Sequence, residues 1–161
     1  MKALRRLLRS FRCAGAGVWE TIRTERNMRI HLCAVVFVVI CGIWQGLAPA
    51  HWALELICCG AVMGLELVNT AIENLCDRVS RERDVQIRRC KDAAAGAVLV
   101  MAAVSAAVWL LLLLGTPAYR QRFAGHFAGS AAGWLIGALW LISSLVFSLG
   151  LDNKTNKGDK K

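Results

Sequence analysis

Three carboxylates and one amide recur along one stretch of this chain at spacings that place them on one face of a helix. Glu66, Asn69, Glu73 and Asp77 stand at positions i, i+3, i+7 and i+11, at one end of an apolar run. A charged residue at membrane depth costs about 3 kcal/mol on insertion scales, so acids found there are functional by default. No basic residue stands among the four acceptors. The pattern therefore favours a bound cation, and hard oxygen ligands suit Mg²⁺.

Two clusters of charged residues stand at the same boundary of the membrane, each before another apolar run. One is Glu-Arg-Asn-Met-Arg-Ile-His at 25–31, and the other is Arg-Arg-Cys-Lys-Asp at 88–92. Acids and bases from three helices thus meet at one depth. Carboxylates can bind Mg²⁺ or act as a general base, and a lysine can bind phosphate. The combination predicts the handling of a nucleotide phosphate at the membrane surface.

These charges also have a structural interpretation. The two flanking clusters are typical of residues that anchor helix ends at the interface. Asp77 would pair with Arg81 at a helix end, and Asp92 would cap the helix that follows it. Glu66 has no such explanation, because it lies a full turn deeper in the apolar run than the other acids.

The remainder of the chain indicates a helical membrane protein. Its 161 residues are 57% hydrophobic and 19% charged, with a mean hydropathy of +0.47. These values exclude a disordered chain and argue against an ordinary soluble domain. No phosphate-binding glycine loop or protein-kinase motif is present, which excludes a soluble nucleotide-binding fold. The seven cysteines show no C-x-x-C spacing, and we interpret them as small apolar residues.

Four apolar runs, at 30–48, 52–72, 93–115 and 130–150, are each close to the roughly 20 residues that a helix needs to cross a membrane. Residues 1–24 instead alternate arginines with apolar residues at three- and four-residue steps, which predicts an amphipathic helix on the membrane surface. A signal peptide is not favoured, because no sizeable apolar run follows before Ile30. The run at 130–150 is rich in Gly and Ser, so a hairpin or a peripheral helix is the alternative to a fourth crossing.

The basic residues predict the orientation. Of the 20 Lys and Arg, eight lie in 1–29, six in 78–91 and four after Asp152, whereas the link at 45–51 has none and the link at 116–129 has only two. With four crossings, 18 of the 20 fall on one side, so the positive-inside rule favours four crossings with both termini in the cytoplasm. Basic clusters beside apolar runs fit anionic lipid headgroups better than nucleic acid.

The chain resembles the small prokaryotic lipid kinases, the diacylglycerol kinase and undecaprenol kinase family. Three blocks carry the resemblance: Glu25-x-Asn27-x-Arg29-Ile30-His31, then Glu66-x-x-Asn69-Thr70-Ala71-Ile72-Glu73-x-x-x-Asp77, then Lys91-Asp92-x-Ala94-Ala95-Gly96-Ala97-Val98. Their order and spacing agree with the family, and the resemblance covers about residues 5–115. The extension beyond Gly115 has no part in the family pattern.

The resemblance implies an all-α integral membrane protein of the bacterial cell (inner) membrane. It would have a surface helix at 1–24 and a three-helix kinase core at 25–115. We expect an extra apolar segment at 116–151, forming a fourth membrane helix, and a basic disordered tail at 152–161. The resemblance further implies a homotrimer whose active sites are shared between protomers at the cytoplasmic face.

The activity implied by the resemblance is ATP-dependent phosphorylation of a membrane lipid alcohol, with Mg²⁺. Position by position, Glu66 resembles the catalytic base, and Glu25 and Glu73 resemble the Mg²⁺ ligands. The residues that resemble contacts to the nucleotide phosphates are Asn69, Lys91 and Asp92, with Arg9 of the surface helix as a further one.

The motifs Asn-x-Arg-Ile-His and Asn-Thr-Ala-Ile-Glu resemble those of undecaprenol kinases more than those of diacylglycerol kinases. We therefore expect undecaprenol as the substrate, with diacylglycerol as the alternative. An ion-coupled transporter would use Glu66 and Asn69 to bind a cation, but the chain lacks the paired repeats or broken helices of transporters. A non-catalytic scaffold packed through small residues at 93–107 would leave Glu66 unexplained.

Overall fold

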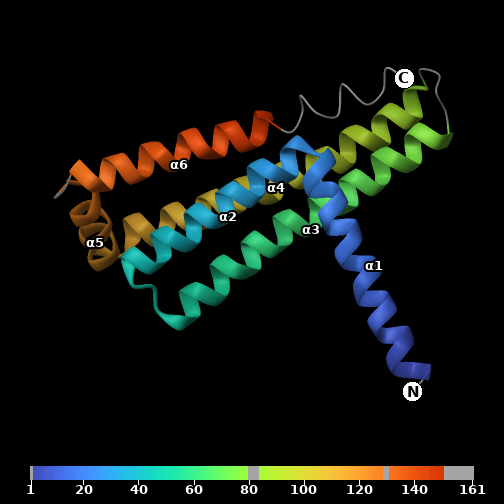
Figure 1. Cartoon of the computed structure of the whole chain (residues 1–161). Helices are drawn as coiled ribbons and strands as arrows, with labels where there is room; N and C mark the ends of the chain where they lie inside the picture. The colour runs from blue at the N-terminus through green and yellow to red at the C-terminus, as the bar shows by residue number, and fades with distance from the viewer. Residues whose placement is uncertain (1, 80–83, 129–130, 151–161) are drawn as a thin grey trace.

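The computed structural model describes residues 2–79, 84–128 and 131–150, and these ranges are helical apart from short links and contain no strand (Figure 1). Six helices follow one another: α1 (Lys2–Thr24), α2 (Arg26–Gln45), α3 (Pro49–Val79), α4 (Val85–Gly115), α5 (Pro117–Ala128) and α6 (Ala131–Gly150). The all-α prediction is confirmed. The tail at 152–161 and Arg81 lie outside the described residues.

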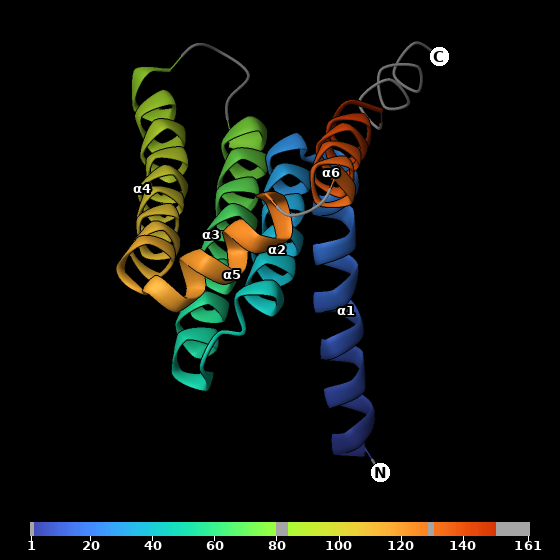
Figure 2. The same ribbon diagram turned by 90° about the vertical axis from the view of Figure 1, so that its left-hand side faces the viewer.

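Three of these helices, α2, α3 and α4, are long and apolar enough to cross a membrane, with 20, 31 and 31 residues. They lie side by side with nearly parallel axes (Figures 1 and 2), and the pair of α3 and α4 makes the most extensive contact. The Ser105 hydroxyl of α4 donates to the Met101 carbonyl at 2.8 Å and lies 3.5 Å from the Cys58 carbonyl of α3. The three predicted core helices are thereby confirmed.

A glycine closes α2 and allows the chain to turn into α3. Gly46 has φ +63°, the left-handed conformation that glycine adopts without steric cost. Its amide donates to the Ile43 carbonyl at 3.1 Å, and the Leu47 amide donates to the Gly42 carbonyl at 3.1 Å, as in a Schellman cap. Pro49 then begins α3, at a helix position where the missing amide hydrogen has no helical partner to lose.

The start of α4 differs from the sequence interpretation. Asp84 caps it, because its Oδ1 accepts hydrogen bonds from the amides of Gln86 at 2.6 Å and Ile87 at 3.4 Å. The interpretation of Asp92 as the cap was wrong, since Asp92 lies about two turns inside the helix. Asp92 directly precedes the apolar run, but the helix begins two turns earlier, in the charged segment before that run.

The first helix leaves the others at a steep angle (Figure 1). Along α1 both the arginines and the large apolar residues Leu4, Leu8, Phe11 and Trp19 are exposed. A helix that presents an apolar stripe without covering it within the protomer is typical of one that lies in a membrane interface.

The extension beyond Gly115 forms two further helices. The link expected at 116–129 is mostly the helix α5, which crosses one end of the bundle (Figure 2), and α6 runs back beside α2 (Figure 1). The Tyr119 hydroxyl accepts a hydrogen bond from the Ala48 amide at 3.0 Å and lies 2.8 Å from His51 Nδ1. The rings of Phe37 and Trp140 lie 4.9 Å apart between their centroids. The predicted fourth segment is thus a 20-residue helix, and its crossing of the membrane stays a prediction.

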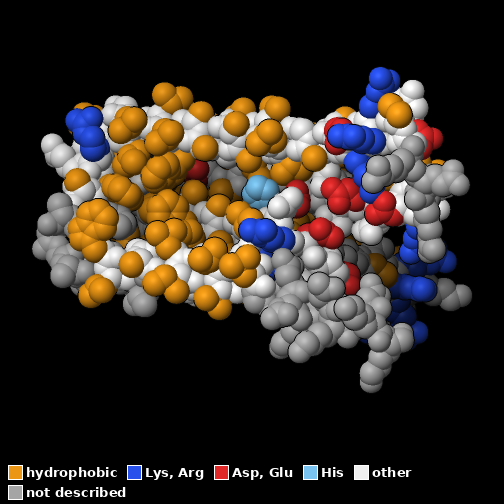
Figure 3. All heavy atoms as spheres, turned by 90° about the horizontal axis from the view of Figure 1, so that it is seen from above, with side chains coloured by type: hydrophobic (Ala, Val, Ile, Leu, Met, Phe, Trp, Pro, Cys, Tyr) orange, Lys and Arg blue, Asp and Glu red, His pale blue; other side chains and the backbone are white. Residues whose placement is uncertain are grey.

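Apolar side chains cover most of the face drawn in Figure 3, and acidic and basic side chains gather at the end where α3 and α4 are linked. Leu99, Leu111 and Ile57 point outward and are about 70% exposed. An apolar exterior of this kind is expected for helices that face lipid.

Candidate active site

The polar face of α3 leads from the interior of the protein toward its charged end. Glu66 and Asn69 are buried, with 2% and 5% of their surface exposed, Glu73 is half-buried and Asp77 is exposed. The helical spacing therefore places the four acceptors in one row, and their exposure increases from Glu66 to Asp77. Glu66, the deepest of them, has no basic side chain within ion-pair distance among the described residues.

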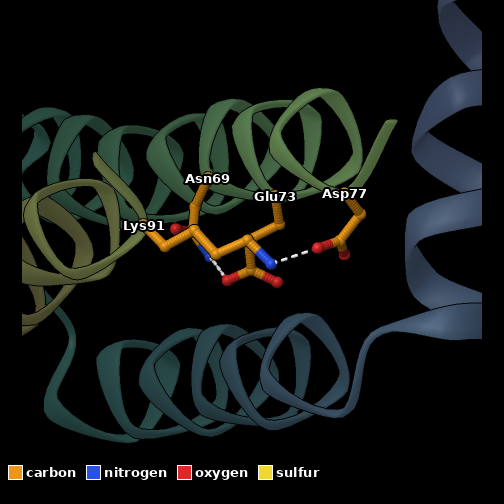
Figure 4. A network of polar contacts seen from close by, with 4 residues as sticks. All are labelled: Asn69, Glu73, Asp77 and Lys91. Atoms are coloured by element: carbon orange, nitrogen blue, oxygen red, sulfur yellow. Dashed lines mark hydrogen bonds and ion pairs between the residues drawn. The ribbon is translucent and has the colours of Figure 1, made fainter. Parts of the chain in front are cut away.

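Hydrogen bonds fix the orientation of two of these side chains (Figure 4). Asn69 Nδ2 donates to Glu73 Oε1 at 2.9 Å, and the Thr70 hydroxyl donates to the backbone carbonyl of Glu66 at 3.0 Å. The amide nitrogen of Asn69 is therefore turned toward Glu73. The buried oxygen of the same amide, Asn69 Oδ1, has no hydrogen-bond partner in the described part of the chain.

A lysine reaches this row from the neighbouring helix. Lys91 of α4 extends to Asp77 of α3, where its ammonium makes an ion pair and a hydrogen bond with Oδ1 (Figure 4). Glu73 adds a further electrostatic attraction on Lys91. The Lys91 ammonium is thus held beside the acceptors by acidic side chains. A nucleotide phosphate can replace these side chains as its anionic partner.

Glu25 brings an acid from another segment toward this row. It stands at the junction of α1 and α2 in extended backbone conformation, with φ −98° and ψ 119°, and its side chain caps no amide of α2. Its carboxylate and that of Glu73 both interact electrostatically with Glu66. Three acids from two different segments therefore share one region, although nothing in the local sequence pairs them.

Two residues predicted for the site do not reach it within the protomer. Arg9 is exposed on α1, sixteen residues before Glu25, which corresponds to about 24 Å along a helix. Asp92 is exposed and lies 3.7 Å from Arg88 in an ion pair one turn away along α4. The structure brings together Glu25, Glu66, Asn69, Glu73 and Lys91.

Arg29 is a residue of this region whose role the sequence did not indicate. It is fully buried, and its Nη1 donates to the carbonyl of Arg23 at 3.1 Å, at the end of α1. Its Nε and Nη2 donate to the backbone carbonyl of Ser148 in α6 at 3.3 and 3.0 Å. One guanidinium therefore joins three helices next to Glu25. No local sequence pattern predicts Ser148 as the partner of Arg29.

The donor atoms of this region are suited to a hard cation. No group of three His, Cys, Asp or Glu within 2–79, 84–128 and 131–150 forms a complete metal centre. The carboxylates of Glu25 and Glu73 and the unpartnered oxygen of Asn69 are nevertheless the oxygen ligands that Mg²⁺ prefers, and Mg²⁺ commonly takes its other ligands from substrate phosphates and water. The residues present fit Mg²⁺ bound together with a nucleotide.

The chain is similar to known proteins over the region that contains this site. A family model described as prokaryotic diacylglycerol kinase matches residues 12–113. Undecaprenol kinase of Bacillus subtilis is 42% identical over 111 residues, which are 69% of this chain and 90% of that protein. Diacylglycerol kinase of Pseudomonas aeruginosa is 30% identical over 112 residues, 70% of this chain and 91% of that protein. Diacylglycerol kinase of Synechocystis is 39% identical over 109 residues, 67% of this chain and 62% of that protein.

No solved structure matches the chain significantly. The matched region nonetheless contains every residue that the fold gathers around Glu66, and it ends two residues before the end of α4. The chain therefore belongs to the prokaryotic diacylglycerol kinase family, and it is a membrane lipid kinase.

Proposed function

We propose that this lipid kinase transfers the γ-phosphoryl group of ATP to undecaprenol at the cytoplasmic face of the membrane, with Mg²⁺, and that diacylglycerol is the alternative substrate. The similarity to a protein named undecaprenol kinase, at 42% identity, supports the first substrate. The similarities to proteins named diacylglycerol kinase, at 30% and 39%, support the second. The basic clusters beside the site support the cytoplasmic face.

Glu66 is the single observation that carries the proposal. Its side chain is 2% exposed, and no basic side chain of the described residues lies within ion-pair distance. An unpaired acid in a membrane helix is costly and needs a functional explanation. A general base within reach of a lipid hydroxyl is such an explanation.

In the proposed reaction, Glu66 accepts the proton of the lipid hydroxyl while the hydroxyl oxygen attacks the γ-phosphorus. One O–P bond forms, and the bond from the γ-phosphorus to the bridging oxygen breaks. ADP leaves with that electron pair, and the lipid phosphate is the product. Lys91 exchanges its contact with Asp77 for a nucleotide phosphate, and Asn69 orients the phosphate chain.

Glu25 and Glu73 are the residues that would hold Mg²⁺. The ion supplies neutralisation of phosphate charge when it is bound with the nucleotide. Arg29 supports Glu25 indirectly, because it fixes the junction of α1 and α2 on which Glu25 stands.

We further propose a homotrimer in which neighbouring protomers complete each other's sites. The position of Arg9 supports this arrangement, because α1 carries it about 24 Å along the helix from Glu25 of the same protomer. Mixing Arg9→Ala protein with Glu66→Gln protein tests it. Shared sites predict activity in the mixed oligomer, because one of its sites contains neither substitution. If each protomer worked alone, every site would carry one substitution and the mixture would stay inactive.

The test of the function is transfer of radiolabelled phosphate from ATP to lipid in mixed micelles. Undecaprenol and diacylglycerol are offered separately and in competition, with Glu66→Gln protein as the blank. Faster transfer to undecaprenol supports the main proposal, and faster transfer to diacylglycerol replaces the substrate but leaves the mechanism. Folded protein that binds no Mg·ATP would overturn the assignment of the site.

A further inference from the structure

A cavity of about 210 Å³ lies between α2, α3 and α4. Its walls are largely apolar and include Val35, Val38 and Val62. His31, Glu55, Ser105 and Trp109 also line it, and neither Glu66 nor Asn69 does. It is therefore an apolar space within the membrane part of the protein that contains a small number of polar groups.

Two polar atoms of these lining residues have no partner in the described part of the chain. Glu55 is 2% exposed, and its Oε1 is buried without a hydrogen bond. The indole Nε1 of Trp109 is buried without an acceptor. A buried polar group that lacks its partner destabilises a protein, so native structures normally provide one. Two such atoms in the walls of one cavity indicate that a ligand supplies the missing partners.

The Glu55 end of the cavity is remote from the proposed catalytic centre, whereas Val62 in its lining precedes Glu66 by one turn. Glu55 precedes Glu66 by eleven residues, close to three helical turns, so both stand on the same face of α3. The rise of an α-helix places them about 16 Å apart along its axis. A lipid hydroxyl at Glu55 is therefore out of reach of Glu66, and a hydroxyl held there is not in position for phosphoryl transfer.

The polar groups restrict the chemistry of the ligand. A cation would need several oxygen ligands, whereas Glu55 is the only acid in the lining. A carboxyl oxygen accepts a hydrogen bond, and an indole N–H donates one. A hydroxyl group satisfies both, because it donates through its hydrogen and accepts at its oxygen. The apolar walls suit a hydrocarbon chain attached to it.

We propose that this cavity is a second, non-catalytic binding site for a membrane-soluble alcohol, with the hydroxyl held between Glu55 Oε1 and Trp109 Nε1 and the chain against the walls from α2 and α4. The site goes beyond the kinase activity, because its occupation requires neither ATP nor Glu66. It would hold an alcohol on the same face of α3 as the catalytic acid, three turns away.

The test is quenching of tryptophan fluorescence in the full-length protein, reconstituted in phosphatidylcholine nanodiscs without nucleotide. The probe is ω-bromodecanol, and bromodecane of the same chain length is the matched compound that lacks the hydroxyl. Subtracting the signal of Trp109→Phe protein isolates the emission of Trp109. We expect saturable quenching by the alcohol and only linear, partition-driven quenching by the alkane.

Three variants locate the hydroxyl. Glu55→Leu removes the acceptor and should weaken the saturable binding about tenfold, the effect expected for one hydrogen bond. Glu55→Gln keeps an acceptor and should bind nearly as well as the unmodified protein. Glu66→Gln should leave the binding unchanged, because the site does not include that residue.

Other outcomes would overturn the proposal. Equal saturation by bromodecane would mean that the cavity selects only for hydrocarbon, and loss of binding in Glu66→Gln would place the alcohol in the catalytic centre. No saturable quenching at all would mean that water alone satisfies Glu55 and Trp109. If Glu55→Leu fails to fold, the comparison of alcohol with alkane in the unmodified protein still tests the alcohol site. A failed kinase assay would not change the result of that comparison.

Discussion

Arg29 at the start of α2 donates two hydrogen bonds to the backbone carbonyl of Ser148, 119 positions further along the chain, at 3.3 and 3.0 Å. The family match ends at residue 113, so this contact joins the kinase core to the extension that follows it. It lies one turn from Glu25. The extension therefore supports the segment that carries one of the proposed Mg²⁺ ligands.

We expect Arg29→Gln to lower the free energy of unfolding by about 2 to 3 kcal/mol, because charge-assisted hydrogen bonds contribute about 1.5 to 3 kcal/mol and their buried acceptors would be left unpaired. Thermal unfolding in detergent measures the change. Arg26→Gln is the matched control, since Arg26 is exposed on the same helix turn. Equal losses in the two variants would contradict a specific role for Arg29.

We expect Glu66→Gln to reduce kcat by about 10² to 10⁴, the range that general base catalysis contributes, with little change in the KM for ATP. Steady-state phosphorylation of the lipid at varied ATP gives both parameters. Glu20→Gln removes an exposed acid from α1 and should behave like the unmodified protein. Wild-type turnover in Glu66→Gln would exclude it as the base.

Glu73→Gln should raise the Mg²⁺ concentration needed for half-maximal activity about tenfold, the lower end of what altered metal ligation costs. Glutamine can still accept the hydrogen bond from Asn69. The change is therefore confined mainly to charge at the proposed metal site. A Mg²⁺ titration at saturating ATP measures it, and an unshifted curve would argue against ligation by Glu73.

Asp77→Asn tests whether Asp77 competes with phosphate for Lys91 or positions Lys91 for it. The pair is partly exposed, with side-chain exposures of 32% for Lys91 and 68% for Asp77, so the free energy of unfolding should stay close to that of the unmodified protein. The KM for ATP should fall, because Asp77 no longer competes with phosphate for the ammonium group. Lys91→Met should raise that KM instead. If Asp77→Asn raised it as strongly, Asp77 would position Lys91 rather than compete for it.

The spacing of acids in the sequence was sufficient to predict the row on α3, because helical periodicity alone puts Glu66, Asn69 and Glu73 on one face. Their burial followed from the apolar run around them. The partner of Lys91 was not predictable in the same way. It depends on how α3 and α4 are aligned, and the sequence offered Arg81 as a nearer partner for Asp77.

The helix boundaries and the extension were predicted less well. Asp84 rather than Asp92 begins α4, since charged turns continue the helix past the end of its apolar part. The helix α5 was expected as a link, although Pro117 at its start and Tyr119 and Phe123 one turn apart were available signals. The contact between Arg29 and Ser148 depends on tertiary packing that no local pattern contains.

The two buried acids of α3 also bear on how the protein enters the membrane. Glu55 and Glu66 are each 2% exposed, and a charged residue within a membrane helix costs up to about 3 kcal/mol on insertion scales. By itself α3 is therefore a weak insertion signal, and it acquires its surroundings only from α2 and α4. We therefore expect stable integration of α3 to depend on α4, which is made after it, so that the chemistry of the site bears on the order in which the helices are integrated.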